Sequence, residues 1–169
     1  TRVAMVRSDV VYVTPIDIFE TSKNVFDTRN EVAVIPKFAT HPVNDRMIYG
    51  PYEAVKVWAT ERFSRLEEHV RSAKPGYGMH SERFMADSII PGIEGNGFKV
   101  EQSPHICFFR ARADGQVFLR DCRDNSHFES VSLPRMKRRV EVITGANCSG
   151  IPGKVRMLYS RVNCQSVTG

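Results

Sequence analysis

The sequence predicts an α/β fold, a mixed sheet with flanking helices, and three observations support this prediction. Short runs rich in β-branched residues, such as residues 31–35, are typical of buried strands. Apolar residues recur at spacings of three and four between residues 51 and 71, which indicates an amphipathic helix. Four polar clusters stand where such elements begin or end, and in open α/β sheets these ends share one rim where ligands bind.

Length and composition agree with a globular protein. The chain has 169 residues, of which 41% are hydrophobic and 25% are charged, so it is long enough to bury a core. Its net charge of +5 favours anionic partners such as phosphates and nucleotides. No apolar stretch approaches the roughly 20 residues that span a bilayer, so we expect no membrane span in this chain.

The strands expected in the first half border polar residues. Residues 3–6 and 10–13 flank Arg7-Ser8-Asp9, which predicts a buried strand whose polar break emerges at the sheet edge. Residues 31–35 predict a second buried strand. A loop over residues 37–50 is expected to follow it, and loops of this kind often carry functional residues.

Two helices are expected next. The first should begin at Pro51, which suits a first helical turn, and should run to Arg71. Its apolar stripe consists of Ala54, Val55, Trp58, Phe63, Leu66 and Val70. Residues 74–78 break this helix, and Ser81 is a suitable cap for a second helix that Pro91-Gly92 should end.

The second half is expected to be richer in strands. Segments 98–101, 106–112 and 117–121 are predicted strands, and Ala113-Asp114-Gly115-Gln116 supplies the turn of a hairpin between the last two. Residues 140–144 predict one more strand.

The chain after residue 132 is strongly basic and is expected to pack loosely. Its charged residues are Arg135, Lys137, Arg138, Arg139, Glu141, Lys154, Arg156 and Arg161. We therefore expect a main domain over residues 1–132 and a basic extension over residues 133–169 that suits an acidic partner. Nucleic acid is not an expected partner, because Phe128 and Tyr159 are not interleaved with the basic residues as stacking requires.

The four cysteines do not have the spacing of a zinc site. Cys107, Cys122, Cys148 and Cys164 form no C-x-x-C pair and have no histidine at ligand spacing. Scattered buried thiols are the simplest expectation. The sequon Asn147-Cys148-Ser149 would accept a glycan in a secretory compartment, where one or two disulfides also become possible.

Two of the polar clusters suit a diphosphate. Asp9, at a predicted strand end, can ligate a divalent cation, and Arg7 on the same side of the strand offers a fork-shaped donor to phosphate. Arg110 and Arg112 alternate along a predicted strand with Asp114, so these side chains should share one face and can clamp a diphosphate. The alternatives are a structural Arg–Asp pair for the first cluster and solvated edge residues for the second.

The other two clusters suit sugar hydroxyls and proton transfer. Asn44-Asp45-Arg46 leads into a helix amino terminus, and such sets of amide, carboxylate and guanidinium groups bind sugars; an ordinary capping loop is the alternative. In His80-Ser81-Glu82-Arg83, the carboxylate of Glu82 stands in a first helical turn and can act as a general base. The alternative is a favourable interaction of Glu82 with the helix dipole.

The order of these clusters resembles the carboxyl-terminal half of a family of glycosyltransferases from plants, algae and microbes, whose catalytic domain is similar to the GT-A fold. The resemblance covers roughly residues 2–121. Its motifs are Arg-x-Asp-Val-Val-Tyr-Val-x-Pro-Ile-Asp from residue 7, Asn-Asp-Arg-Met-Ile-Tyr-Gly-Pro-Tyr-Glu-Ala from residue 44, His-Ser-Glu-Arg-Phe from residue 80 and Arg-Ala-Arg-Ala-Asp-Gly from residue 110. It implies a Rossmann-related mixed sheet with flanking helices, incomplete at its amino end, because the β/α units that bind the nucleotide base in GT-A enzymes would precede residue 7.

The resemblance also implies roles for particular residues. Asp9 matches the last acid of the D-x-D motif that binds metal and the donor diphosphate, while Arg7 replaces the first acid. This departure weakens the expectation of Mn²⁺ or Mg²⁺ at Asp9, because arginine cannot ligate a cation but can neutralise a diphosphate directly. Arg7, Asp9, Asn44, Arg46, Arg110 and Arg112 are thus the expected donor-binding residues. Glu82 matches the base position of inverting enzymes, and Asp45 is the second expected catalytic residue.

The function implied is transfer of a sugar from a nucleotide sugar to the hydroxyl of a glycan or small molecule. The motifs G-x-S-x-G, G-x-x-x-x-G-K-[ST] and G-x-G-x-x-G are absent, which disfavours common hydrolase and nucleotide-loop chemistry. The alternative is a non-catalytic subunit of a larger assembly that keeps the scaffold and binds an acidic partner. The family implies the Golgi or another secretory lumen, with the cytoplasm as the alternative.

Overall fold

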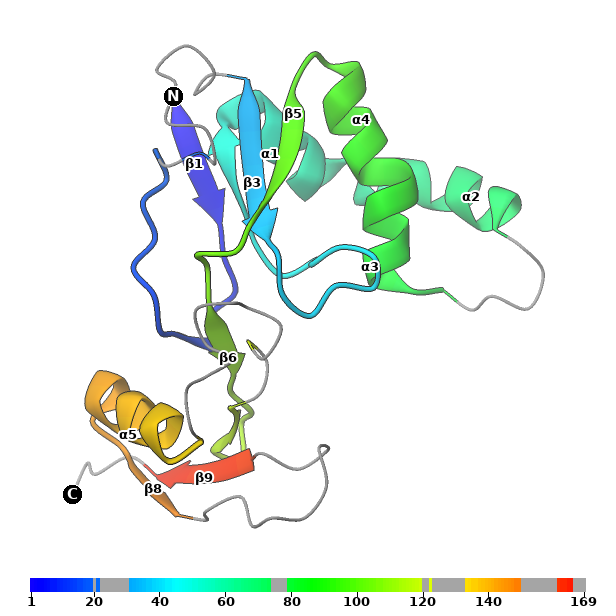
Figure 1. Ribbon diagram of the computed structural model, residues 1–169. Helices are drawn as coiled ribbons and strands as arrows, with labels where there is room; N and C mark the ends of the chain where they lie inside the picture. Colours follow the sequence, from blue (N-terminus) through cyan, green and yellow to red (C-terminus); the bar gives the residue numbers. More distant parts are fainter. Residues whose placement is uncertain are drawn as a thin grey trace. The chain divides into compact units, whose positions relative to one another are not determined.

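The structure is a computed structural model that describes residues 1–19, 21, 31–73, 79–119, 122, 133–149 and 161–165. The chain divides into two compact units (Figure 1). Unit 1 comprises Thr1–Arg7 and Ile16–Ser103, and unit 2 comprises Ser8–Pro15 and Pro104–Gly169. Both units contain helices and small sheets, so the predicted mixed α/β class is confirmed. In the described ranges, no helix has the length and apolar character needed to cross a membrane.

The sheet of unit 1 has four strands in the order β1-β4-β3-β5. They are β1 (Arg2–Met5), β3 (Val32–Pro36), β4 (Ile48–Pro51) and β5 (Lys99–Ser103). β3 pairs with β5 in parallel and with β4 antiparallel, so the sheet is mixed. The strands predicted over residues 31–35 and 98–101 are confirmed as β3 and β5. Every residue of the two inner strands, β3 and β4, is buried.

Two strand predictions for this sheet need correction. The predicted loop 37–50 runs only to Met47, because Ile48–Pro51 forms β4 between β1 and β3. Asn44-Asp45-Arg46 therefore precedes a strand and not the expected helix amino terminus. The single buried strand predicted over residues 3–6 and 10–13 is two strands in different sheets: the edge strand β1, in which Ala4 and Met5 are exposed, and β2 (Val10–Tyr12), which belongs to unit 2. β1 pairs with β4 along its whole length and has no strand on its other side in the described sheet.

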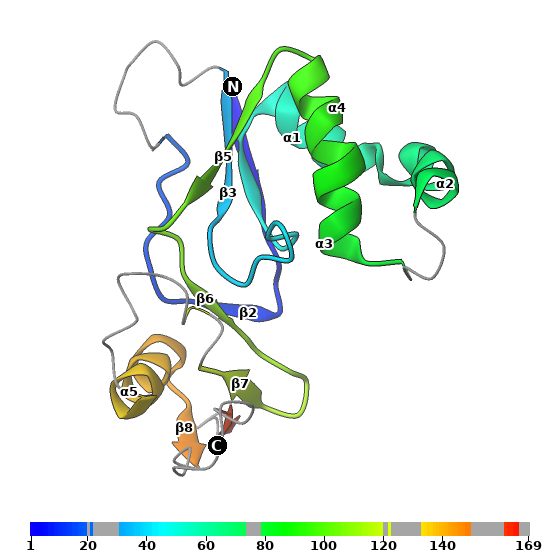
Figure 2. The same ribbon diagram turned by 45° about the vertical axis from the view of Figure 1, so that its right-hand side comes forward.

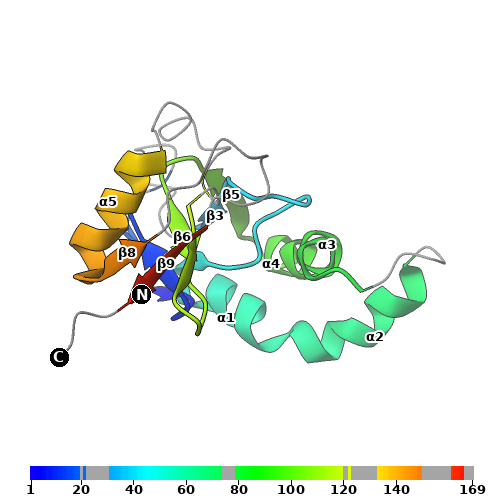
Figure 3. The ribbon, with the colours of Figure 1, turned by 90° about the horizontal axis from the view of Figure 1, so that it is seen from below.

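The helical segments of unit 1 lie between β4 and β5 in the sequence. They are α1 (Tyr52–Thr60), α2 (Arg62–Ser72), α3 (Ser81–Phe84), a π-helical turn η2 (Met85–Ile89) and α4 (Ile90–Gly95). Figure 3 shows α1 and α4 next to each other on the same side of the sheet, in agreement with their contacts to β4 and β5.

The first predicted helix is confirmed except for a break at Glu61, which separates α1 from α2. Its predicted apolar stripe is buried only in α1, where Trp58 is 1% exposed. In α2, Phe63 is 89% and Val70 is 56% exposed. The break changes the direction of the helix, so the stripe of α2 does not continue over the core.

The second predicted helix is longer than expected and begins differently. Ser81 does not cap it, because His80 holds the cap position and the Ser81 hydroxyl bonds to side chains instead. The helix also continues through Pro91-Gly92 to Gly95. Proline lacks an amide hydrogen, and the wider π-helical turn directly before it, in which the Ile90 amide donates to Met85, relaxes the regular α-helical pattern there. The predicted break at residues 74–78 lies outside the described residues.

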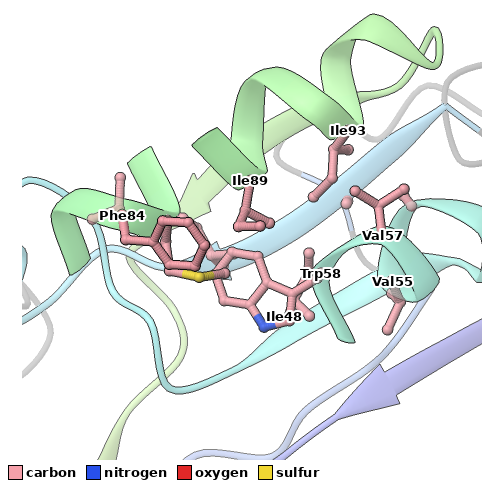
Figure 4. Close-up of a cluster of buried hydrophobic side chains, with 12 residues drawn as sticks. Ile48, Val55, Val57, Trp58, Phe84, Ile89 and Ile93 are labelled. Atoms are coloured by element: carbon pink, nitrogen blue, oxygen red, sulfur yellow. The ribbon is translucent and has the colours of Figure 1, made fainter. Parts of the chain in front are cut away.

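The core of unit 1 lies between the sheet and these helices (Figure 4). Trp58 from α1 packs beside Phe84 and Ile89 of the second helical segment and Ile48 of β4. Gly50 allows β4 to approach β3 closely, since a Cβ atom at Gly50 would lie 2.7 Å from the Cα atom of Ala33.

Unit 2 contains two small sheets and one described helix (Figure 2). Its elements are β2 (Val10–Tyr12), β6 (Phe108–Arg110), β7 (Gln116–Phe118), α5 (Leu133–Thr144), β8 (Asn147–Ser149) and β9 (Arg161–Gln165). β2 pairs with β6, and the other sheet has the order β7-β9-β8. The predicted hairpin turn at residues 113–116 is confirmed by the antiparallel bridge between Ala111 and Val117.

Two predictions for the basic extension are wrong. Residues 140–144 are the end of helix α5, not a strand. Met136 and Val140, one helical turn apart, are both buried, so they lie on one face of α5. The described part of the extension is also not loosely packed, because β8 and β9 join β7 in one sheet. Whether residues 1–132 form one functional domain stays a prediction.

All four cysteines are paired, so the expectation of scattered thiols is wrong. Cys107 bonds to Cys122, and Cys148 bonds to Cys164. The bonds link residues 15 and 16 positions apart. Both belong to unit 2.

Candidate functional site

Two of the four predicted clusters meet in unit 1. The Ser81 hydroxyl donates to Oδ2 of Asp45 at 2.6 Å, although the two residues are 36 positions apart in the sequence. The same hydroxyl oxygen lies 3.1 Å from Oε2 of Glu82. A hydroxyl has only one hydrogen, so Asp45 and Glu82 share a single donor between them.

The loop after β3 holds Asp45 in place through its neighbour. Asn44 is completely buried; its side-chain nitrogen donates to the carbonyl of Phe38 at 2.8 Å, and its side-chain oxygen accepts the amide hydrogen of Arg46 at 3.0 Å. Val43 and Met47 are buried on either side. Asn44 therefore shapes the loop from inside, and this arrangement leaves the half-buried Asp45 at the surface beside Ser81.

The start of the second helical segment holds Glu82. Phe84, two residues further on, is buried against the core, and its amide donates to the carbonyl of His80 at 2.9 Å. These contacts fix the first turn, so the side chain of Glu82 is only 16% exposed. Nδ1 of His80 lies 3.1 Å from Oε2 of Glu82 and can donate to it when that nitrogen carries the proton.

Two more side chains complete the group. The His41 ring stands edge-on to the His80 ring, with 6.4 Å between centroids. Arg62 lies at the start of α2, where its Nε donates to the carbonyl of Trp58 at 3.1 Å. Burial lowers the pKa of Arg62, and the negative charge of Asp45 opposes this shift. We call the group His41, Asp45, Arg62, His80, Ser81 and Glu82 the Asp45–Glu82 site.

The arrangement combines two hydroxyl-binding carboxylates with basic groups. Each carboxylate oxygen has lone pairs beyond the one that faces Ser81, so further hydroxyls can donate to this site. Glu82 is held by His80 on one side, and Asp45 is balanced by Arg62 on the other. Such a site can orient a polyol and accept a proton from one of its hydroxyls.

The predicted donor-binding arginines of unit 2 share one aromatic ring. The guanidinium carbons of Arg110 and Arg112 lie 4.7 Å and 5.4 Å from the centroid of the Phe118 ring. The two guanidinium groups thus lie over the same ring, although β6 ends at Arg110 and Arg112 follows it outside the strand. Asp114 does not extend that face, since its carboxylate accepts the amide hydrogen of Gln116 within the turn.

The remaining predicted residues are divided between the units. Arg7 is an exposed residue of unit 1, whereas Asp9 is a half-buried residue of unit 2. Among the residues that the structure describes, no group of three or more His, Cys, Asp or Glu side chains could hold a metal ion. The metal role of Asp9, the diphosphate role of Arg7 and the shared rim of all four clusters stay predictions.

Sequence reasoning missed His41 and Arg62 as members of the site. His41 lies in a loop without a recognisable motif, and Arg62 is one of several arginines on a helix. Only folding brings them to Asp45 and Glu82. A separate surface cavity of about 400 Å³ between α1 and the turn before β5 contains none of the predicted site residues; it is lined by Glu53, Lys56, Val57, Thr60, Glu61, Asn96 and Phe98.

In comparisons with known proteins, the chain matches no family model, no curated protein and no solved structure.

Proposed function

We propose that the chain is the carboxyl-terminal part of a GT-A-like glycosyltransferase, and that the Asp45–Glu82 site binds the acceptor. The observation that carries this proposal is the hydroxyl of Ser81 placed between the two carboxylates, at 2.6 Å and 3.1 Å. A hydroxyl therefore fits within hydrogen-bond distance of both carboxylates. The two carboxylates come from the two clusters that the family resemblance marks for sugar binding and for the base.

In the proposed reaction, the acceptor oxygen attacks the first carbon of the donor sugar. Glu82 takes the proton from that oxygen, the new carbon–oxygen bond forms, and the bond to the nucleoside diphosphate breaks. Asp45 accepts a hydrogen bond from a neighbouring hydroxyl and fixes the position of the acceptor. His80 orients Glu82 through the contact at 3.1 Å.

The donor side of the proposal rests on the arginines and Asp9. Within unit 2, Arg110 and Arg112 would neutralise the leaving diphosphate, with or without Mn²⁺ or Mg²⁺ at Asp9. Support comes from the common face of Arg110 and Arg112 over Phe118, because two adjacent guanidinium groups suit a diphosphate. Asn44 would contribute indirectly by shaping the loop.

The test is a transfer assay on the full chain, extended upstream to its natural start, with a panel of nucleotide sugars and a glycan acceptor. Glu82→Gln should reduce transfer by about 10²–10⁴-fold, the usual contribution of a general base. Calorimetric titration of UDP and GDP, with and without Mn²⁺, should show unchanged nucleotide binding in that variant.

Glu94→Gln is the matched control, because Glu94 is an exposed residue of the same helical segment. It should leave transfer unchanged. Equal turnover of Glu82→Gln and the control would refute the assignment of the base, and failure to bind either nucleotide would argue against the donor site.

A second candidate is a non-catalytic subunit that binds an acidic partner through α5. This helix buries Met136 and Val140 and exposes Arg135 and Arg138 one turn apart. Binding of polyglutamate that falls with salt and in the double variant Arg135→Glu and Arg138→Glu, without nucleotide binding, would favour this candidate.

A further inference from the structure

A short motif in unit 2 has no role in the proposed reaction. The tripeptide Asn147-Cys148-Ser149 is the only Asn-x-Ser/Thr sequence in the chain. The three residues form strand β8, at the edge of the sheet β7-β9-β8.

The strand places the three side chains of the motif on two different faces. Side chains alternate between the two faces of a strand, so Asn147 and Ser149 share a face while Cys148 points to the other. Asn147 and Ser149 are exposed, whereas Cys148 is 1% exposed and bonds to Cys164 directly opposite on β9. The acceptor amide and the hydroxyl of the motif therefore both lie on the open face.

The described residues beside this face are polar. Asn147 lies opposite Gln165, and Ser149 lies opposite Asn163. Both partner residues are exposed and polar, so the strand opposite β8 offers a polar surface to a group attached at Asn147. The amide of Cys148 faces away from β9 and donates to the carboxylate of Glu141 at 3.1 Å, which occupies the outer edge of the strand without touching the open face.

The disulfides supply an independent argument about the compartment. Two bonds in one unit of a small protein are typical of chains that fold in an oxidising lumen, which is also where asparagine glycosylation occurs. Glycosylation of the motif and formation of the two disulfides thus require the same oxidising compartment.

We propose that Asn147 is an N-glycosylation site. The side-chain nitrogen of Asn147 attacks the first sugar carbon of a lipid-pyrophosphate-linked oligosaccharide, bound to the cell's oligosaccharide transferase. The nitrogen–carbon bond forms, the bond from that carbon to the pyrophosphate oxygen breaks, and the amide loses one proton as the lipid pyrophosphate leaves. The Ser149 hydroxyl is the part of the motif that the transferase recognises.

The disulfide sets the order of events. Once Cys148 is bonded to Cys164, the motif is held in a paired strand, so we expect transfer to be faster before this bond forms. Glycosylation and disulfide formation therefore compete for the same three residues. Removing Cys164 should raise the glycosylated fraction, and replacing Ser149 by threonine, the more efficient acceptor residue, should do the same.

The experiment is secretion of the full chain from a eukaryotic cell, followed by intact-mass measurement before and after peptide N-glycosidase. The wild-type protein should lose the mass of one glycan on treatment. Asn147→Gln and Ser149→Ala should show no glycan, while Asn163→Gln, an exposed asparagine on the neighbouring strand, should keep it. Both loss variants replace an exposed polar side chain with a small or similar one, so folding should be preserved.

Two results would overturn the proposal. One is a wild-type protein that is secreted with both disulfides formed and carries no glycan. The other is a glycan that persists in Asn147→Gln. An equal glycosylated fraction in Cys164→Ser and wild type would contradict the competition with the disulfide.

Discussion

The two units of this protein are stabilised by different means. Unit 1 buries a continuous apolar cluster around Trp58 between its four-stranded sheet and its helices. Four of the five described strands of unit 2 have three residues each, and the unit carries both disulfides. Unit 2 also buries apolar side chains, among them Phe108, Phe109 and Leu119, but both cross-links belong to it, and cross-links add stability by restricting the unfolded chain. We therefore expect packing variants to affect unit 1 and reduction to affect unit 2.

The largest effect is expected from Trp58→Ala. Trp58 is 1% exposed at the centre of the cluster, and removal of a buried aromatic side chain costs about 3–5 kcal/mol. Hydrogen exchange measured peptide by peptide should show faster exchange in β3 and β4, with unit 2 unchanged. Equal loss of protection in both units would show that they do not unfold separately.

Reduction of the disulfides should have the next largest effect. Bonds that close loops of this length contribute about 2–4 kcal/mol each. Dithiothreitol should therefore increase exchange in β6–β9 while β3 keeps its protection. The double variant Cys107→Ala and Cys122→Ala tests the first bond alone, and undiminished protection in β6 would contradict the comparison.

Gly50→Ala should lower the free energy of unfolding of unit 1 by about 1–3 kcal/mol. The added methyl would lie 2.7 Å from the backbone Cα of Ala33, so β4 must move away from β3. Thermal denaturation is a suitable measurement. Gly95→Ala is the control, since a Cβ atom there meets nothing within 4 Å. A similar loss of stability in both variants would show that the contact with Ala33 is not the cause.

Ser88→Ala should cost about 1 kcal/mol. Ser88 Oγ lies 3.0 Å from Nδ1 of His69, which is 7% exposed, and its removal leaves a buried ring nitrogen without this partner. Denaturant unfolding should show the loss, and Ser64→Ala, at an exposed position of the same helix as His69, should show less.

The smallest effect is expected from Phe63→Ser, below about 0.5 kcal/mol. Phe63 continues the sequence pattern of Trp58 but is 89% exposed in α2. Comparing it with Trp58→Ala in the same denaturation experiment shows whether the loss of stability follows the sequence spacing of the two residues or their burial. A cost above 1 kcal/mol for Phe63→Ser would show that the side chain is covered in solution.

Local sequence was sufficient for the elements with strong periodicity or composition. β3 follows from five successive residues of apolar character, and α1 from the spacing of Ala54, Val55 and Trp58. The hairpin turn at residues 113–116 follows from its aspartate and glycine. In each case the preference is set by neighbours along the chain.

The tertiary structure alone decided the remaining features. β4 and α5 were not recognised, because the burial of Ile48, Met136 and Val140 depends on distant strands. The pairing of the cysteines depends on how β8 meets β9 and on where Cys122 returns to Cys107.

The candidate site shows the same division. The sequence by itself marked Asp45 and Glu82 as functional candidates from their residue type and their place near helix starts. Only folding brought Asp45 to Ser81 across 36 positions and added His41 and Arg62. A short polar motif determines which chemistry a residue can perform, whereas its partners are determined by packing between segments that are remote in the chain.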